Sequence, residues 1–578
     1  MFDIIIRGGT LVDGTGAAAY KADLGIRNGV IAAIGSDLGP ATREIDASGQ
    51  LVTPGFVDMH THYDGQATWD PHLTPSGWHG VTTVVMGNCG VGFAPCRAED
   101  RDWLINVMEG VEDIPGAALS EGISWEWETF PEYMDALERR EYALDLAVQV
   151  PHSAVRGYVM GRNSSEQDAA SADQIAQMKG IVHEALEAGA LGFTTSRTPL
   201  HRTAEGVFVA GTFAEVQELE GICEALGEVG HGVFEVADEH MDVPKDLSWL
   251  EGIAQSTGRP VVFNLSQTDF ASDLWKKGLD GVRDAGERGV PLFAQAAGRA
   301  IGILMTWRGT AHPFALHPTW KRLSELPWEE ALVELKKPET RAALLSEQPA
   351  DPTLFEAYIT QSYGKMYALG ACHYEPDPSE SVAATAAARG VSPAEVAYEW
   401  MMEDEGTGFI YFPLFNYSDG ALDVLHEMHS EPRIKMGLSD GGAHCGAICD
   451  GGMPTFMLTF WTRDRTRGER LSVEYIVKRQ TQDTAAFYGL HDRGVLKVGY
   501  RADVNVIDYE RLALRKPVMA HDLPAGGRRL VQRADGYTAT IVAGQVTMWQ
   551  GEPTGVLPGR LVRGEQHAPS SLESVAAK

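Results

Sequence analysis

Two histidines separated by one residue, His60 and His62, are the strongest chemical signal in the sequence. They end an apolar run, residues 51–59, that predicts a buried strand, and alternate side chains of a strand point to the same side. Both imidazoles can therefore bind one divalent metal ion, with Nε2 at about 2.0–2.1 Å from it. The Pro-Gly pair within the run and the strand context favour a metal site over two ordinary polar histidines.

Cys89 lies just after a second apolar run, residues 81–86. A thiolate here would lie at the same end of the sheet and could hold or bridge metal. A small buried cysteine is also a common core residue, and the position alone favours that alternative.

Asp440 follows the last apolar run, residues 434–438. An aspartate at this point can contact both the metal and its water, take the proton of that water and pass it to the leaving group. The alternative, an ordinary Ser-Asp-Gly-Gly turn, is less plausible beside His60 and His62. His444, on the following loop, could orient substrate or stabilise the developing oxyanion.

Arg197 is a candidate for substrate binding. It follows the apolar run 190–195, and its guanidinium could bind a substrate carboxylate in bidentate fashion. The alternative is a surface arginine with no role in binding.

These candidate residues must be positioned by the strands that they follow. Apolar runs alternate along the chain with amphipathic helices, and this alternation predicts a parallel sheet. Eight runs indicate an α/β fold of the (β/α)8 TIM-type barrel, with its chemistry at the C-terminal mouth. The eight runs are residues 51–59, 81–86, 143–150, 190–195, 232–236, 261–265, 292–294 and 434–438.

Local motifs predict where some elements begin or turn. In a capping box, a Ser or Thr side chain and a Glu or Gln three residues later bond each other's backbone amides. Residues 171–174 predict a helix start at Ser171, and residues 212–215 predict another at Thr212. The pair Asn28-Gly29 predicts a hairpin, because both residues of its turn must reach positive φ.

The distribution of these patterns predicts the domains. We expect residues 1–56 with 495–551 to form a small β-sandwich domain from both chain termini, and residues 57–494 to form the barrel. Residues 298–433 are too many for a plain connection and predict an insertion over the active site. Residues 552–578 are expected to form a loose tail.

The composition limits the function. Lys and Arg number 48 against 80 Asp and Glu, a net charge of -32 that argues against nucleic acid and anionic membranes as partners. The six cysteines are scattered, which argues against a disulfide framework. With no signal peptide or apolar span in the sequence, we expect a cytoplasmic enzyme without a membrane partner that acts on a small molecule as a homo-oligomer.

Taken together, five segments resemble the N-acyl-D-amino-acid deacylase (D-aminoacylase) family of the amidohydrolase superfamily. The resemblance covers most of the chain. It implies zinc as the metal, Cys89 as a ligand, and Asp440 as the general acid and base. The segments are residues 8–16, 54–62, 87–95, 439–441 and 492–503.

The chain departs from this family on the fifth and sixth strands, where the family carries metal-binding histidines. Glu235 takes the place of the first, and Asn264 or Leu265 takes the place of the second. The lysine that often follows, and grips the substrate carboxylate, corresponds to Gln267. Glu235 could bind zinc through oxygen, or it could be a paired carboxylate at a strand end.

The missing histidines predict one firmly bound zinc, held by His60, His62 and Asp440, with a second ion possible. Cys89 and Glu235 would lie close enough to join the site. His231 and His240 are weaker candidates, because either could lie on the surface.

The function predicted is metal-dependent cleavage of an amide C–N bond in a small N-acylated compound. The resemblance names N-acyl-D-amino acids as the substrate class. The alternatives are hydrolysis of a cyclic amide or ester on the same scaffold, and a metal-poor scaffold without catalysis. Retention of His60, His62 and Asp440 argues against the last of these.

Overall fold

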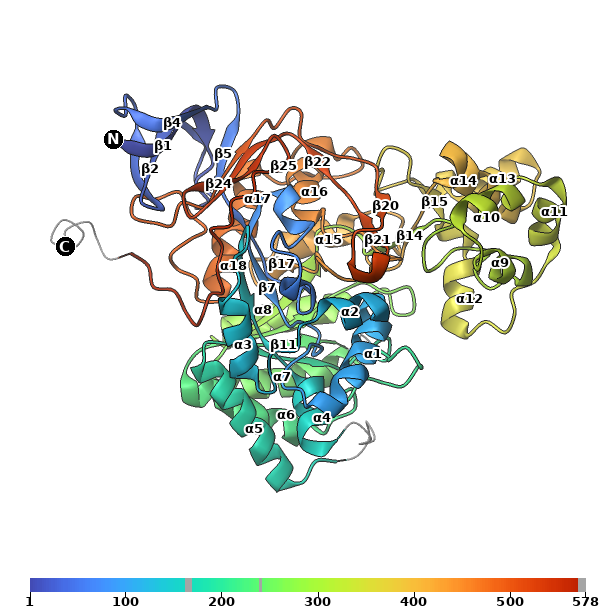
Figure 1. Cartoon of the computed structure of the whole chain (residues 1–578), viewed down its shortest axis with the longest axis horizontal. Coiled ribbons are helices and arrows are strands. Elements are labelled where there is room, and N and C mark those ends of the chain that lie inside the picture. The colour runs from blue at the N-terminus through green and yellow to red at the C-terminus, as the bar shows by residue number, and fades with distance from the viewer. Residues whose placement is uncertain (162–168, 239–241, 570–578) are drawn as a thin grey trace.

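The computed structural model describes residues 1–161, 169–238 and 242–569 (Figure 1). Eight parallel strands form the barrel. Hydrogen bonds join its first three strands in one sheet and the remaining strands in a second sheet. The strands are β6 (Phe56–Asp58), β7 (Val81–Met86), β8 (Asp145–Val148) continued by β9 (Val150–Pro151), β10 (Gly192–Ser196), β11 (Val233–Ala237), β12 (Val261–Asn264), β13 (Leu292–Ala297) and β17 (Ile434–Gly437).

Beyond the ends of the first and last strands, the backbone closes the barrel. Thr61 forms a parallel bridge with Gly441, and the amide of His62 donates to the Gly441 carbonyl over 2.8 Å. The amide of Asp440 donates to the His60 carbonyl. The (β/α)8 fold class predicted from the eight apolar runs is therefore confirmed, and closure itself joins the two segments that carry His60, His62 and Asp440.

Helices surround the barrel, and the two predicted helix starts have different outcomes. The capping box at Ser171 is present. The start at Thr212 is wrong, because its hydroxyl donates to the Val209 carbonyl within a turn and the helix begins at Val216. The barrel helices are α1 (Arg101–Glu112), α2 (Gly116–Gly122), α3 (Phe130–Glu138), α4 (His152–Met160), α5 (Ala172–Glu187), α6 (Val216–Val229), α7 (Val243–Thr257), α8 (Leu274–Glu287), α15 (Asp423–His429), α16 (Met453–Thr459), α17 (Val473–Gln480) and α18 (Gln482–Phe487).

Strands from both ends of the chain form one nine-stranded sheet beside the barrel. In it β5 pairs antiparallel with β18, which joins the N-terminal and C-terminal strands over a shared apolar core. The predicted hairpin at Asn28-Gly29 is present, with φ of 52° and 76°. The strands are β1 (Phe2–Leu11), β2 (Tyr20–Arg27), β3 (Val30–Gly35), β4 (Ala41–Asp46), β5 (Leu51–Pro54), β18 (Val504–Ile507), β23 (Tyr537–Val542), β24 (Gln545–Trp549) and β25 (Glu552–Pro553).

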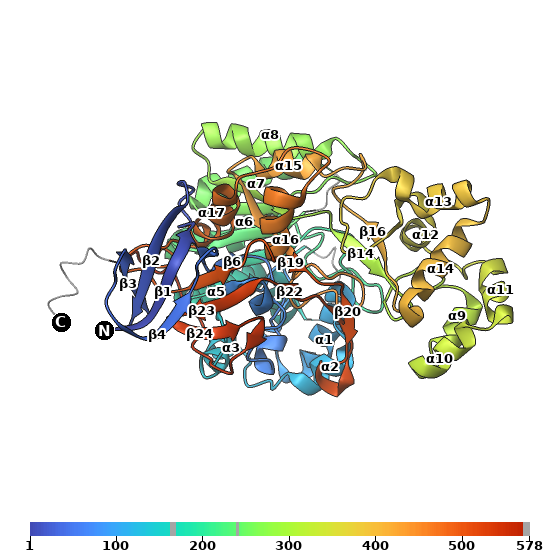
Figure 2. The same ribbon diagram turned by 90° about the horizontal axis from the view of Figure 1, so that it is seen from above.

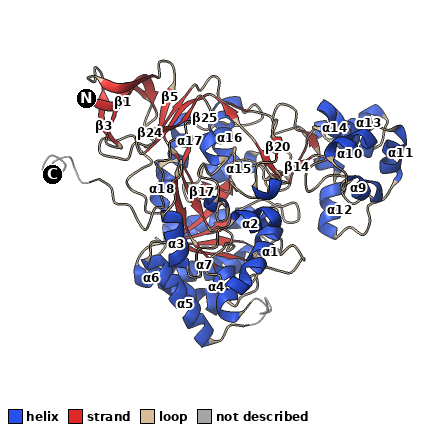
Figure 3. Cartoon of the chain, in the orientation of Figure 1, coloured by secondary structure: helices blue, strands red, loops and turns tan. Residues whose placement is uncertain are grey.

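Between β13 and β17 the chain leaves the barrel and builds a separate helical unit, seen at the right of Figures 1 and 2 and largely blue in Figure 3. Its own core stacks Trp307 on Phe314 and packs both against Tyr398. Three strands connect it to the barrel mouth. The elements are β14 (Gly302–Met305), α9 (Pro318–Leu323), α10 (Trp328–Leu335), α11 (Pro338–Ser346), α12 (Leu354–Gln361), β15 (Tyr367–Ala368), α13 (Val382–Arg389), α14 (Pro393–Gly406) and β16 (Ile410–Pro413).

Short elements complete the described chain. None of the described helices combines the length and apolarity needed to cross a bilayer. The remaining strands are β19 (Ala513–Leu514), β20 (Val518–Ala520), β21 (Arg529–Val531) and β22 (Ala534–Asp535).

The C-terminal segment is not loose over its described part, which corrects the expectation for residues 552–578. Leu561 bridges Leu146 of β8 in parallel, on the edge opposite β7. Val562 donates to the Leu146 carbonyl over 2.7 Å, and both Leu561 and Val562 are buried. The segment therefore fills an edge of the barrel left open where the two sheets separate. Residues 570–578 lie outside the described residues.

This packing generates a stability prediction. Leu561→Ala should lower the free energy of unfolding by about 2–5 kcal/mol, as for other large-to-small changes in a core. Urea unfolding of the full chain measures it, and Val556→Ala, at a more exposed position of the same segment, is the control. A tail that does not pack on the barrel would give equal stabilities for both variants and the parent.

Candidate metal centre

Four predicted side chains meet at the mouth of the barrel. Nε2 of His60 lies 3.3 Å from Sγ of Cys89 and 3.4 Å from Oδ1 of Asp440. Nε2 of His62 lies 3.7 Å from the same Asp440 oxygen. Both histidines and Cys89 are buried, and their donor atoms all lie within 4.8 Å of one another.

These separations fit a single ion. Donors placed tetrahedrally around zinc, at about 2.0–2.3 Å from it, lie about 3.3–3.7 Å apart. The contacts of His60 with Cys89 and Asp440, and of His62 with Asp440, fall in this range. The nitrogen, sulfur and oxygen donors are also those that zinc accepts. The residues therefore fit the metal that the family resemblance implies.

Each imidazole is oriented through its second nitrogen. Nδ1 of His60 is 3.3 Å from the amide oxygen of Gln295, an acceptor, which leaves the lone pair on Nε2. Nδ1 of His62 is 3.3 Å from Oε1 of Glu112. Such partners fix the ring and make the coordinating nitrogen more basic.

Glu235 lies beneath the cluster, where it accepts hydrogen bonds. Its Oε2 accepts from the backbone amide of Cys89 over 3.0 Å, and its Oε1 accepts from Gln295 over 3.2 Å. Gln295 also donates to Asn264 over 2.6 Å. Three neighbouring strands thus carry a hydrogen-bonded polar layer at the level where the family carries metal-binding histidines.

The backbone around Cys89 is held close to the fourth strand. Cys89 has φ of 55°, and Gly90 has φ of 70°. A Cβ on Gly90 would lie 2.7 Å from the Cα of Thr195, so no larger residue fits there. This close packing requires glycine at position 90 and holds the backbone so that the Cys89 thiol points toward His60.

The cluster gathers several buried acidic groups whose charged forms burial disfavours. Burial, with Glu235 and Glu112 nearby, raises the pKa of Cys89 well above its usual value. Burial raises the pKa of Glu235 to about 8 and that of Asp64 to about 7. Buried carboxylates need a compensating cation. A bound metal ion would supply that charge and allow the Cys89 thiolate to form.

The pKa values of the two histidines shift in opposite directions, and that of Asp440 shifts downward. Burial lowers the pKa of His60 to about 4. Burial also opposes protonation of His62, but Glu112 and Asp440 outweigh it and raise its pKa to about 9. Burial disfavours charge on Asp440, yet hydrogen bonding to His62 and the charge of His60 outweigh it and lower its pKa. Asp440 is therefore held as a carboxylate.

The turn that carries Asp440 is strained. Leu438, Asp440 and His444 all have positive φ, of 60°, 50° and 51°. Such conformations are costly for residues other than glycine and cluster at functional sites. Ser439 holds the turn by donating to the carboxylate of Asp58 and to the His60 carbonyl.

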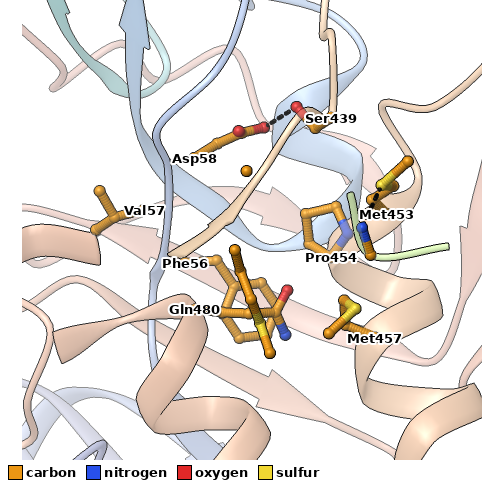
Figure 4. A pocket seen from close by; sticks show the side chains of 11 residues that line it. Phe56, Val57, Asp58, Ser439, Met453, Pro454, Met457 and Gln480 are labelled. Carbon is orange, nitrogen blue, oxygen red and sulfur yellow. Dashed lines mark hydrogen bonds between the residues drawn. The ribbon is translucent and has the colours of Figure 1, made fainter. Parts of the chain in front are cut away.

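Figure 4 shows this Ser439–Asp58 hydrogen bond as a dashed line. Beside it is a cavity of about 30 Å³, large enough for about one water molecule. It is closed by apolar side chains and by Gln480 of α17. The bond therefore lies in a buried, tightly packed layer that supports both ends of the barrel closure.

A larger cavity, of about 300 Å³, opens above the cluster. His60, His62, Cys89 and Asp440 line it, and so does His444. Nε2 of His444 lies 3.6 Å from Glu112, and its side chain is 24% exposed. The structure thus places the His444 side chain in the wall of this cavity.

Arg197 does not join this cavity. Its guanidinium donates to the Ala214 carbonyl over 2.6 Å and lies over the Trp249 ring. Neighbouring His201 lines the cavity instead, with Nδ1 2.9 Å from the Ser196 hydroxyl. The expected contact between Arg197 and a substrate carboxylate has no support in this geometry.

The remaining candidates have structural roles or lie outside the description. Nε2 of His231 bonds the Leu186 carbonyl, before β11 begins and so at the opposite end of the barrel from the cluster. Gln267 donates to Asp419 and accepts from the amide of Ser418. These two bonds hold the segment that leads from the insertion back to the barrel. His240 lies outside the described residues.

Sequence reasoning missed Glu112 and Gln295. Glu112 is the last residue of α1, and no local motif distinguishes it from the other acidic residues of the chain. Gln295 is a single polar residue in the apolar strand β13, which is a signal that could have been used.

Comparisons with known proteins agree with this geometry. The profile described as "Amidohydrolase family" matches residues 43–548. A D-aminoacylase of Alcaligenes xylosoxydans xylosoxydans is 34% identical over 46% of this chain and 50% of its own length. An N-acyl-D-aspartate deacylase of that organism is 26% identical over 99% of this chain and 97% of its own. The crystal structure of an N-acyl-D-glutamate deacylase from Bordetella bronchiseptica, complexed with zinc and a phosphonate inhibitor, has a TM-score of 0.65 at 24% identity, with 97% and 100% coverage.

The donor set generates a prediction about metal content. Protein dialysed without chelator should hold about one zinc per chain by elemental analysis, and His60→Ala and Cys89→Ser should lose most of it. Glu235→Ala should keep it, because both Glu235 oxygens already accept hydrogen bonds. Cys96→Ser, at a buried thiol whose Sγ donates to the Arg97 carbonyl, is the control. Two zincs that survive dialysis would contradict the single-ion geometry.

The Asp440 turn generates a second prediction. Ser439→Ala removes the hydroxyl that bonds buried Asp58, which should cost about 1–3 kcal/mol of stability and lower kcat through a displaced Asp440. Unfolding and steady-state kinetics measure these effects. Ser153→Ala is the matched control, because that buried hydroxyl has no hydrogen-bond partner among the described residues. Equal kinetics in the two variants would mean that Ser439 does not position Asp440.

Proposed function

Because the chain belongs to the amidohydrolase family, we propose that it hydrolyses the amide bond of an N-acyl-D-amino acid. The observation that carries the proposal is the meeting of Asp440 with two imidazoles and a thiol at the floor of a substrate-sized cavity. The family resemblance drawn from the motifs is confirmed. The substrate class is supported by the relatives that act on N-acyl-D-aspartate and N-acyl-D-glutamate.

His60, His62 and Cys89 would hold zinc with the Asp440 carboxylate beside them, so that a coordination position stays open for water. When bound there, zinc would polarise the acyl oxygen and make a water molecule acidic enough to attack at neutral pH. The carboxylate of Asp440, which borders the cavity, takes the proton of the attacking water. It then delivers this proton to the nitrogen of the amide as the C–N bond breaks.

His444 and Glu112 support this chemistry from the side. His444 lines the cavity close to Asp440 and is placed to donate to the oxygen that becomes negative during attack. Glu112 contacts both His444 and His62, so one carboxylate orients a ring on each side of the reacting centre. The six unpaired cysteines support a proposed location in a reducing compartment such as the cytoplasm.

The proposal is tested with pairs of N-acetyl amino acids of opposite hand. Zinc-loaded enzyme should release amine from the D series and not from the L series. Asp440→Asn should lower kcat by about 10²–10⁴-fold, the usual contribution of a positioned acid-base group. Its far-ultraviolet circular dichroism should match the parent, which shows that the fold is kept. Hydrolysis of a cyclic amide or an ester, with no N-acyl amino acid cleaved, would overturn the proposal.

A further inference from the structure

The cavity above the metal cluster has one polar side and one apolar side. The polar side is the cluster itself with the ends of β11 and β12. The apolar side is formed largely by the insertion and by the segments that enter and leave it. Its residues from this part of the chain are Ile301, Ile303, Ala311, Phe355, Ile359, Leu414 and Phe415.

Lysine and arginine are absent from the described lining of the cavity. Lys365, near the base of the insertion, is held by the Asp269 carboxylate over 2.6 Å. A second carboxylate on a substrate would therefore lose water without gaining a Lys or Arg partner, beside a cluster that already contains the buried acids Glu112 and Glu235.

The apolar side continues to the surface. Phe355 and Leu200 line the cavity, yet they are 38% and 44% exposed. Phe355 and Phe270 each contact the ring of Tyr358. An apolar path thus leads from Ile303, which is buried, to an exposed aromatic rim. A substrate group that follows this path would bury apolar surface along its length.

We infer that the substrate carries a large uncharged hydrophobic group, either as its acyl chain or as its amino-acid side chain, and that acidic N-acyl amino acids are poor ligands. The inference rests on the proposed function for the identity of the scissile amide. It separates this chain from the relatives that act on N-acyl-D-aspartate and N-acyl-D-glutamate. The insertion selects the hydrophobic group, and the barrel residues act on the amide.

Binding to zinc-supplemented Asp440→Asn, measured by calorimetry, tests the inference whether or not turnover occurs. One series lengthens the acyl group of D-alanine from acetyl to hexanoyl to decanoyl. The other keeps acetyl and changes the amino acid from D-alanine to D-phenylalanine to D-glutamate. If the acyl group occupies the apolar side, we expect affinity to rise about threefold per methylene in the first series. If the amino-acid side chain occupies it, we expect the D-phenylalanine compound to bind more tightly than the D-alanine compound in the second series. In both cases the D-glutamate compound should bind most weakly.

The series that rises identifies the group that occupies the apolar side. Flat affinities in both series, or tightest binding of the D-glutamate compound, would overturn the inference. Failure of the proposed function has a different signature, since wild-type enzyme would then cleave none of these compounds while the binding trend persists.

Neighbouring residues of α12 provide a matched pair of variants. Phe355→Ala should weaken binding of the ligand that gains most from its hydrophobic group by about tenfold and leave N-acetyl-D-alanine unchanged. Leu354→Ala is the control, because Leu354 is 94% exposed and does not line the cavity. Equal loss in both variants, or no loss in Phe355→Ala, would contradict the assignment of the apolar side as the binding surface.

Discussion

The buried negative charge at the barrel mouth is the constraint on which the rest of the site depends. Asp440, Glu235, Glu112 and Asp64 all act on the Cys89 thiol at the end of a closed barrel. Burial of so many acids is unfavourable unless a cation joins them. The contacts of His60 with Cys89 and Asp440, and of His62 with Asp440, have zinc-like separations. The electrostatic requirement and the donor geometry therefore point to one place where a cation would bind.

Barrel closure provides the rigidity that this geometry needs. The first strand delivers His60 and His62, the last delivers Asp440, and the hydrogen bonds that close the barrel run between those same segments. A displacement of either strand end would therefore disturb closure and coordination together. The bonds of the Ser439 hydroxyl to Asp58 and to the His60 carbonyl reinforce this junction.

The sequence predicts the features that depend on local pattern. His60 and His62 follow an apolar strand directly, and strand alternation points both side chains the same way. Asp440 also follows an apolar strand, but a turn with positive φ aims its carboxylate. Cys89 needed the family resemblance, because its aim depends on how tightly Gly90 packs against the fourth strand. Glu112 could not be found in this way, because it reaches the site from the end of a helix through tertiary packing. The predicted role of Arg197 has no support in the structure, because a position at a strand end does not determine which acceptor a long side chain reaches.

The departure from the family on strands five and six changes what the barrel can bind. A second ion would need nitrogen donors there, but Glu235, Asn264 and Gln295 satisfy one another by hydrogen bonds instead. That layer contacts the Cys89 amide and the His60 ring, so it orients both groups without adding a ligand to the metal. The insertion has its own core and contributes the apolar side of the cavity. Chemistry and selectivity therefore rest on separately packed parts of the chain, and the insertion can change its side of the cavity without disturbing the donors on the barrel.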